Sequence, residues 1–280
     1  MSIPHHLLRE IIENALKEDI GFSDITTDSI VPENLNIRAY IIAKEEGIIA
    51  GLPVAKEVFK FLDEEVNFSQ KVSDGERVER GKIIAEIYGK ARAILSGERV
   101  ALNFLQRLSG IATFTNYCVS LAKPYNVKIL DTRKTTPMLR ILEKYAAKVG
   151  GGENHRFALY DMVLIKDNHI RIAGGITEAV RRVREKVPPF YKIEVETENL
   201  EQVREALENK VDIIMLDNMD IETIKKAVEI INGKVLIEVS GNIKPEDIKV
   251  IAPLGINFIS MGKLTHSVKS LDISLEIEGE

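Results

Sequence analysis

Residues 192–242 read KIEVETENLEQVREALENKVDIIMLDNMDIETIKKAVEIINGKVLIEVSGN, and this stretch decides the fold. It contains three short apolar runs typical of buried strands, at Lys192–Val195, Ile213–Leu216 and Val235–Val239. Between them lie two segments whose apolar residues recur at helical spacing, Leu200–Leu207 and Ile221–Ile231. Strands that alternate with helices predict right-handed βαβ units and a parallel sheet.

The same alternation extends along the chain in both directions. Strand-like runs precede the stretch at Val127–Leu130 and Met162–Ile165 and follow it at Ile256–Ser260, and a further helical segment covers Thr177–Lys186. Six units of this kind predict an α/β fold with an incomplete, about six-stranded α/β barrel. The periodicity alone is also compatible with a doubly wound open sheet, so closure of the barrel is an inference.

The N-terminal part of the chain has a different pattern. A helix is expected over His6–Lys17, and strand-like runs separated by glycine turns follow it at Ile37–Ile42, Gly47–Ala50 and Ile83–Tyr88. We therefore expect an N-terminal α+β sandwich domain over residues 1–107 and the barrel domain over residues 108–280. A helical pattern covers Glu98–Lys123, and Gly110 is expected to mark a joint between two helices there.

Composition excludes several classes of protein. The 280 residues are 45% hydrophobic and 29% charged with a net charge of −5, which is typical of a globular protein and argues against nucleic-acid binding. No apolar run approaches the ~20 residues needed to cross a bilayer, and no secretory signal is visible. The single cysteine, Cys118, cannot form an internal disulfide, so a cytoplasmic location is expected.

Positively charged residues follow the first two strands of the predicted barrel. Arg133 and Lys134 follow Val127–Leu130, His155 and Arg156 follow a triple glycine, and Lys166 ends an apolar run. The carboxyl ends of barrel strands carry the reactive groups, so these side chains are expected to converge. Arginine grips carboxylates and phosphates in two-point fashion, and the cluster therefore predicts a ligand with several negative charges.

Acidic and small residues follow the later strands. Glu194 and Glu196 alternate along one strand and so face the same side, and Asp217 ends the next strand. Such carboxylates suit sugar hydroxyls, Mg²⁺ or a developing positive charge. The residues Ser240-Gly241-Asn242 and Gly262 expose backbone N–H groups that can surround a phosphate.

Several of these segments resemble one family. The segments LDTRKTTP at 130–137, GGGENHR at 150–156 and LIKDNH at 164–169, with EDIG at 18–21, SGN at 240–242 and LTHS at 264–267, resemble quinolinate phosphoribosyltransferase, a type II phosphoribosyltransferase. The resemblance implies an N-terminal sandwich followed by an incomplete barrel. It also implies that quinolinate and 5-phosphoribosyl 1-pyrophosphate react with Mg²⁺ to give nicotinate mononucleotide, CO₂ and pyrophosphate for NAD synthesis.

The resemblance also implies roles for individual residues. Lys166, Glu196 and Asp217 are expected to be catalytic, and the last two are expected to bind Mg²⁺. Family members are at least dimers, so Arg99 is expected to reach the site of the neighbouring subunit. The full set of expected substrate-binding residues is Arg99, Thr132, Arg133, Lys134, His155, Arg156, Lys166, Glu196, Asp217, Ser240, Gly241, Asn242, Ser260, Met261 and Gly262.

Three other interpretations are open at this point. Lys166 at a strand end is also suited to a Schiff-base aldolase or lyase. The segment Val72–Ile87 looks like half of a biotinyl or lipoyl carrier domain, although no matching lysine hairpin is present and a sandwich turn is favoured. A nicotinate phosphoribosyltransferase shares the chemistry without decarboxylation, but the number of cations favours a dicarboxylate.

Overall fold

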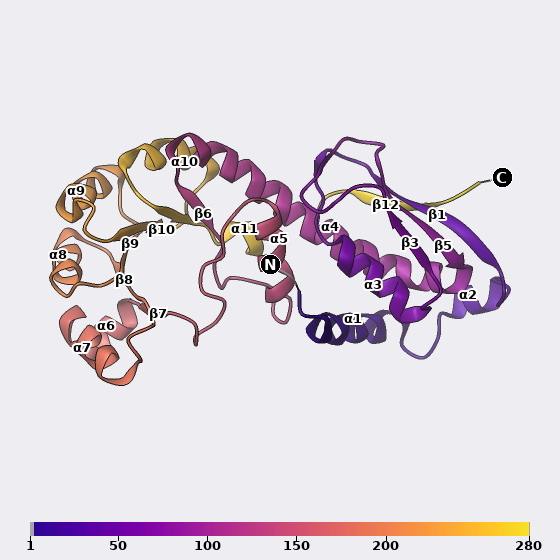
Figure 1. Ribbon diagram of the computed structural model, residues 1–280, viewed down its shortest axis with the longest axis horizontal. Coiled ribbons are helices and arrows are strands. Elements are labelled where there is room, and N and C mark those ends of the chain that lie inside the picture. Colours follow the sequence, from indigo (N-terminus) through magenta and orange to yellow (C-terminus); the bar gives the residue numbers. More distant parts are fainter. Residues whose placement is uncertain (1–2, 280) are drawn as a thin grey trace. The chain divides into compact units, whose positions relative to one another are not determined.

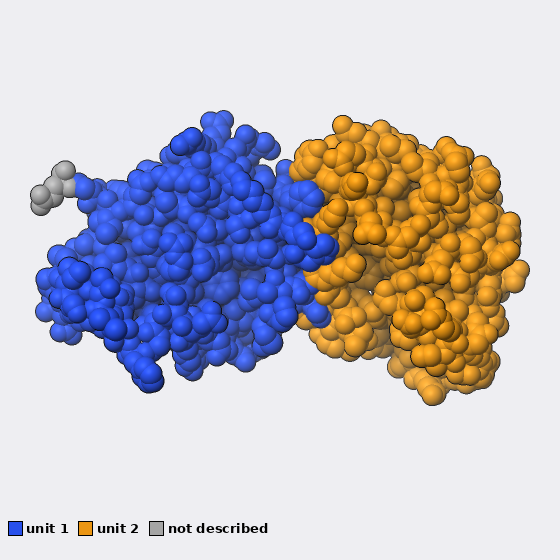
Figure 2. Space-filling view, turned by 180° about the vertical axis from the view of Figure 1, so that it is seen from behind, with its two compact units in different colours: residues 1–116, 135–151, 264–280 blue, residues 117–134, 152–263 orange. Residues whose placement is uncertain are grey.

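The computed structural model describes residues 3–279, which form two compact units (Figure 2). Unit 1 combines residues 1–116, 135–151 and 264–280, and unit 2 combines residues 117–134 and 152–263. Each unit is therefore discontinuous in sequence. The expected domain boundary between residues 107 and 108 stays a prediction.

Unit 2 is built on a parallel sheet of six strands. Their order is β6 (Lys128–Leu130), β11 (Phe258–Ser260), β10 (Leu236–Ser240), β9 (Ile213–Asp217), β8 (Ile193–Thr197) and β7 (Val163–Ile165). Every pairing between neighbours in this sheet is parallel. The prediction of an incomplete, six-stranded α/β barrel is thus confirmed.

Helices connect the strands of unit 2. They are α6 (Asp167–Ala173), α7 (Ile176–Lys186), α8 (Leu200–Glu208), α9 (Ile221–Ile231) and α10 (Pro245–Ile251), with short 3₁₀ turns at Lys123–Tyr125 and Ala252–Leu254. In Figure 1 the helices α7, α8 and α9 lie along the outer side of the strands. Each buries one apolar stripe against the sheet, for example Ile224, Ala227 and Ile231 in α9.

The edge of the sheet at β6 is extended by a short loop segment. The loop residue Glu153 forms a parallel bridge with Leu130. Its N–H donates to the carbonyl of Ile129 at 2.8 Å, and its carbonyl accepts from the N–H of Asp131 at 3.1 Å. Residues 153–156 are therefore anchored where a further strand of a complete barrel would begin.

Unit 1 contains an antiparallel sheet in the order β12 (Ile273–Ile277), β1 (Asn36–Ala43), β5 (Ile83–Lys90) and β3 (Asn67–Gln70), together with the small pair β2 (Gly47–Ile48) and β4 (Arg77–Val78). Its helices are α1 (His5–Ile20), α2 (Ile25–Ile30), α3 (Leu52–Leu62) and α5 (Arg140–Val149), and α11 (Lys263–His266) begins at its edge. The strand-like segment of the suspected carrier motif is β5, which pairs with β1 and β3 inside this sheet.

The longest helix, α4 (Ala91–Ala122), is continuous, so the expected joint at Gly110 is wrong. Gly110 instead allows a close approach of two backbones. A Cβ atom at this position would lie 2.2 Å from the carbonyl oxygen of Lys269 and 3.0 Å from Cα of Ser270. The helix accepts the glycine because the C-terminal segment packs directly against it.

Within residues 3–279, no helix combines the length and the apolar character that a transmembrane span requires.

Candidate functional site

All the predicted site residues except Arg99 belong to unit 2. Because the six strands are parallel, their carboxyl ends lie at the same edge of the sheet. Most of the predicted residues lie at or just after those ends, and His155 and Arg156 lie in the loop between β6 and β7. Arg99 lies in unit 1, where it is an exposed residue in the interior of α4.

Lys166 and Glu196 form an ion pair between the ends of neighbouring strands. The ammonium nitrogen of Lys166, directly after β7, lies 2.5 Å from Oε2 of Glu196 on β8. The Glu196 side chain is 9% exposed and that of Lys166 44%, so the carboxylate is the buried partner.

Two arginines bring positive charge close together at the same edge. Burial and the charge of Arg133 lower the pKa of the Arg156 guanidinium, while Glu194 and Asp161 raise it. Arg156 also donates from Nη1 to the carbonyl of Met162 at 3.1 Å, which ties it to the residue before β7. Two neighbouring guanidinium groups are a site suited to an anionic ligand.

The loop that carries Arg156 is held by Asp131 at the end of β6. One carboxylate oxygen of Asp131 accepts the N–H of His155 at 2.9 Å, and the other accepts the side-chain amide of Asn154 at 2.6 Å. Asp131 is fully buried. The end of a barrel strand thus fixes the backbone of residues 154 and 155.

A buried cluster lies beneath this loop. The imidazole Nε2 of His155 lies 3.1 Å from Oε2 of Glu194 and 3.5 Å from Oε2 of Glu238. The side chains of both glutamates are at most 1% exposed. Burial and the neighbouring Glu194 raise the pKa of Glu238, while His155 and Ser260 act in the opposite direction.

The loops after β9 and β10 are joined to each other. The N–H of Asn218 donates to the carbonyl of Ser240 at 3.1 Å, and its side-chain amide donates to Asp217 at 2.8 Å. Gly241 has φ +99°, and a Cβ atom there would lie 2.4 Å from Oδ1 of Asn218. Asn218 and Asn242 also have positive φ, so the two loops present backbone groups in an irregular turn suited to an anion.

The remaining predicted residues lie close to the same strand ends. Ser260 ends β11 and Met261 follows it. Both are buried, and the N–H of Met261 donates to the carbonyl of Leu130 at 3.0 Å. The Thr132 hydroxyl accepts the N–H of Lys134 at 3.0 Å. Lys134 is exposed, and Gly262 is half-buried.

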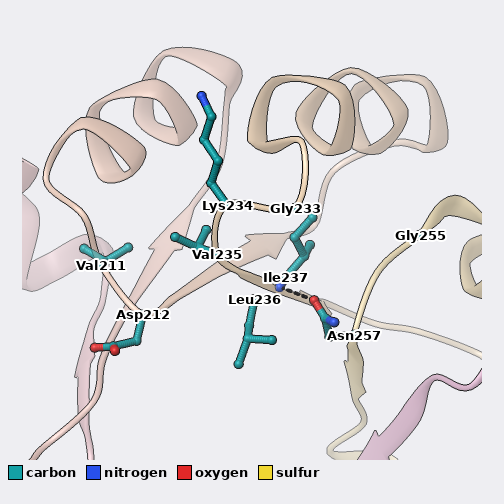
Figure 3. A pocket seen from close by; sticks show the side chains of 9 residues that line it. All are labelled: Val211, Asp212, Gly233, Lys234, Val235, Leu236, Ile237, Gly255 and Asn257. Carbon is teal, nitrogen blue, oxygen red and sulfur yellow. Dashed lines mark hydrogen bonds between the residues drawn. The ribbon is translucent and has the colours of Figure 1, made fainter.

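A pocket of about 410 Å³ lies at the opposite ends of the strands (Figure 3). It is lined by turns that precede β9, β10 and β11, and one wall is held by a 2.8 Å hydrogen bond from the N–H of Ile237 to Asn257. In barrels this end supports stability, whereas chemistry takes place at the carboxyl ends. The candidate site is therefore at the edge that carries Lys166 and Arg156.

Sequence reasoning missed part of the cluster. The sequence predicts a strand at Val235–Val239 without a role for Glu238, although a single carboxylate inside Val-Leu-Ile-Glu-Val is itself a signal of a functional interior. Asp131 and Asn154 lie in the family motifs quoted above. Their structural role, to hold the loop through the Asp131 carboxylate, can be seen only in the folded chain.

Comparisons with known proteins point to one family. The family model described as "Quinolinate phosphoribosyl transferase, C-terminal domain" matches residues 111–276, and the corresponding N-terminal domain matches residues 24–109. A probable nicotinate-nucleotide pyrophosphorylase (carboxylating) of Methanocaldococcus jannaschii is 48% identical, covering 96% of both chains. Its counterpart in Bacillus subtilis is 47% identical, covering 98% of this chain and 94% of the relative.

Solved structures show the same likeness. NadC from Streptococcus pyogenes is 43% identical with a TM-score of 0.96, covering 99% of both chains. The nicotinate-nucleotide pyrophosphorylase from Francisella tularensis is 43% identical with a TM-score of 0.94, covering 99% of this chain and 98% of that one. A human nicotinic acid phosphoribosyltransferase, at 12% identity and a TM-score of 0.65, shares the fold alone. On these matches the chain belongs to the quinolinate phosphoribosyltransferase family.

Proposed function

We propose that this protein transfers phosphoribosyl from 5-phosphoribosyl 1-pyrophosphate to quinolinate, with loss of CO₂, and thereby makes nicotinate mononucleotide for NAD synthesis. The relatives named above support the activity. The single observation in this chain that carries it is the charge arrangement, in which Arg133 acts on the charge of Arg156 and Lys166 pairs with Glu196. A compound with several negative charges relieves the repulsion between the two arginines.

The basic residues bind the pyridine dicarboxylate in this proposal. Arg133 and Arg156 provide two-point contacts to carboxylates, and Lys166 contributes a third positive charge. Thr132, Lys134 and His155 complete this part of the site. The family resemblance assigns His155 to it, although both of its ring nitrogens already face groups inside unit 2.

The sugar donor occupies the later strand ends. Ser240, Gly241, Asn242 and Gly262 bind the 5-phosphate through backbone N–H groups, with Ser260 and Met261 beside them. Glu196 and Asp217 bind the ribose hydroxyls. Their carboxylates also stabilise the positive charge that develops at C1 as the bond to pyrophosphate lengthens.

The same two carboxylates suit Mg²⁺. Mg²⁺ prefers oxygen ligands and is usually held by one or two carboxylates together with substrate phosphates, a donor set that Glu196 and Asp217 provide. When bound, the ion neutralises charge on the leaving pyrophosphate. Glu196 already pairs with Lys166, so this lysine and the ion share one carboxylate in the proposal.

The reaction needs positioning more than a protein nucleophile. The pyridine nitrogen forms a bond to C1 of the ribose, and the bond from C1 to pyrophosphate breaks. When CO₂ leaves, the electron pair of the breaking C–CO₂ bond stays on the ring carbon, where the neighbouring pyridinium nitrogen stabilises it, and a proton then takes the place of the CO₂. The chain's own contribution is to hold both anions in register and to surround C1 with negative charge.

The assembly and the location are also proposals. We expect a homo-oligomer, at least a dimer, in which Arg99 serves the neighbouring subunit's site. Exposed large apolar side chains such as Met138, Leu159, Tyr160 and Ile172 are consistent with surfaces that a partner subunit covers. A cytoplasmic location is supported by Cys118, a buried thiol whose pKa burial raises to about 12.

The decisive experiment is to incubate the purified protein with quinolinate, the sugar donor and Mg²⁺ and to measure CO₂ release and nicotinate mononucleotide. Nicotinate serves as the matched control, because it lacks one carboxylate and leaves a cation without a partner. Leaving a charged group unpaired costs ~2–5 kcal/mol, so nicotinate should react at least tens of times more slowly. Equal catalytic efficiency with both acids would contradict a dicarboxylate site.

A further inference from the structure

The interior of the barrel contains a polar layer beneath the site. Glu194 on β8 and Glu238 on β10 come from alternate strands, which is how one layer of a barrel is filled. Branched apolar side chains ordinarily occupy such layers, and buried carboxylates are costly. Among residues 3–279, the Oε1 atoms of both glutamates have no hydrogen-bond partner. Neither residue is needed to close the sheet. The presence of two carboxylates in this layer must therefore be explained by the residues that they contact.

The contacts of His155 assign its tautomer. The N–H of Arg156 donates to Nδ1 of the imidazole at 2.8 Å, and a backbone amide can act only as a donor. Nδ1 therefore carries no proton, and the ring proton resides on Nε2, where it faces both glutamates. The imidazole is neutral, and it donates to Glu194 at 3.1 Å.

The two glutamates differ in charge. Two carboxylates that meet at a single N–H cannot both be ionised without strong repulsion. Burial and Glu194 raise the pKa of Glu238, so Glu238 is the protonated member. The charge of Glu194 also acts on Arg156, since it favours the ionised guanidinium there.

The cluster is connected to Arg156 through the backbone. The imidazole of His155 is held from below by Glu194 and in turn accepts the N–H of Arg156. Asp131 holds the same loop from the other side through the N–H of His155. The position of the Arg156 backbone, and with it the guanidinium, therefore depends on the orientation of one imidazole ring.

We propose that Glu194 is a positioning residue of the phosphoribosyl-transfer site, which acts through His155 to hold Arg156 in place for the pyridine dicarboxylate. The inference rests on the proposed function. Glu194 supplies the negative charge and the hydrogen-bond acceptor, and Glu238 supplies a neutral polar wall that fits the imidazole. Glu194 acts on Arg156, which binds quinolinate in the proposed function, so its effect falls on quinolinate binding and not on the sugar donor.

Paired glutamine variants test the assignment. Gln resembles a protonated glutamic acid in shape and charge, so Glu238→Gln should keep the KM for quinolinate within about twofold of wild type. Glu194→Gln removes a charge and should raise that KM about tenfold or more, with KM for the sugar donor changed less than twofold. Glu201→Gln, an exposed residue in the first turn of α8, is the matched control and should change neither.

The comparison of KM for quinolinate with KM for the sugar donor distinguishes a positioning role from general damage to the barrel. An unchanged quinolinate KM in Glu194→Gln overturns the inference, and so does an equal rise of both KM values. If Glu194→Gln does not fold, Glu194→Asp keeps the charge and serves instead, with an expected rise smaller than tenfold that is again confined to quinolinate. Wild type must form nicotinate mononucleotide in the same assay. Its failure would refute the proposed function, whereas an active wild type with an unaffected Glu194→Gln variant refutes this inference alone.

A double-mutant cycle tests the route through His155. In a His155→Gln background the hydrogen bond from Nε2 is gone, so adding Glu194→Gln should raise the quinolinate KM less than twofold further. A full additional effect would mean that Glu194 acts independently of the imidazole and would overturn the inference.

His155, Glu194 and Glu238 also have the residue types of a metal site. One zinc ion per chain, retained by dialysed wild type and lost in Glu194→Gln, would reassign the cluster as a metal site.

Discussion

Arg133 lies in the loop after β6, and its charge acts on the guanidinium of Arg156. We predict that Arg133→Lys lowers the affinity for quinolinate, because lysine keeps the charge but loses the two-point fork. Affinity for the sugar donor should change less. Titration calorimetry with each ligand measures both, and an equal loss for the two would place Arg133 at the phosphates instead.

Glu238 should make stability depend on pH. Its pKa is raised in the folded protein, so between the ordinary carboxyl range and that raised value the folded chain holds a proton that the unfolded chain has released. The contribution to the free energy of unfolding is therefore full at low pH and is lost as pH rises through the folded pKa. Glu238→Gln removes this dependence, so the variant should lose less stability than wild type between about pH 5 and about pH 8.

Urea unfolding at several pH values, followed by circular dichroism, measures the effect. Parallel stability curves for wild type and Glu238→Gln would show that Glu238 titrates normally in the folded chain.

Gly241 combines two constraints in the proposed phosphate loop. Its φ of +99° disfavours any side chain, and a Cβ atom would also lie 2.6 Å from the backbone nitrogen of Asn218. Gly241→Ala should therefore raise KM for the sugar donor at least about tenfold, since the backbone amides must move. Gly233→Ala is the control, with φ +70° but no atom within 4 Å, so it bears only the backbone cost of about 1–2 kcal/mol. Steady-state kinetics should show a normal KM for Gly233→Ala, and a normal KM in both variants would contradict the assignment.

In helix α4, a contact between distant segments of the chain overrides the local helix propensity of one residue. A glycine inside a helical pattern predicts a break because it lowers helix propensity, yet α4 continues through Gly110. The reason lies in residues far along the chain, since the backbone of Lys269 and Ser270 occupies the space where a side chain would be. A contact between segments so distant in sequence leaves no trace in the periodicity of either one.

Gly110→Ala should consequently destabilise the protein, although alanine is the better helix former by about 1 kcal/mol. The carbonyl oxygen 2.2 Å from the new Cβ belongs to the backbone, so the helix or the C-terminal segment must shift. Overpacking of this kind costs roughly 1–3 kcal/mol. Ser120→Ala, an exposed position of the same helix, controls for helix propensity. Chemical denaturation should place Gly110→Ala below wild type and Ser120→Ala at or slightly above it, and a more stable Gly110→Ala would show that the close contact is absent.

The strands of the barrel were predictable because each is short, apolar and flanked by an amphipathic helix. β12 was not, because Ile273–Ile277 gives no separate indication of its partner. It pairs with β1, in a register that joins Ile273 to Ala43.

The residues at strand ends were predictable for the same reason as the strands, while the buried layer of Glu194 and Glu238 was recognisable only in part. Glu194 was identified by its alternation with Glu196, but the partnership with Glu238 depends on which strands lie two apart in the sheet.

At the scale of the whole molecule, strand–helix alternation established the α/β class, but it could not distinguish a barrel from an open sheet. That choice depends on strand order, and the observed order β6-β11-β10-β9-β8-β7 places the first strand of the sheet beside the last. Unit 1 likewise draws on three separate parts of the chain, and only long-range pairing reveals this. Arg99 belongs to unit 1, whereas the other proposed substrate ligands belong to unit 2. The proposed role of Arg99 in the neighbouring subunit's site is therefore tested with mixed subunits.

Arg99 is exposed, and an ordinary surface ion pair would contribute at most about 1 kcal/mol to stability. If it completes the neighbouring subunit's site, Arg99→Ala and Lys166→Ala should each be nearly inactive alone. A mixture that exchanges subunits should regain activity, because a heterodimer has one site that takes an intact Lys166 from one chain and an intact Arg99 from the other. Random pairing makes about half the molecules heterodimers with one intact site of two, so roughly a quarter of wild-type activity is expected. Native mass spectrometry verifies the exchange. Exchange without recovered activity would mean that Arg99 acts within its own chain or has no part in the reaction.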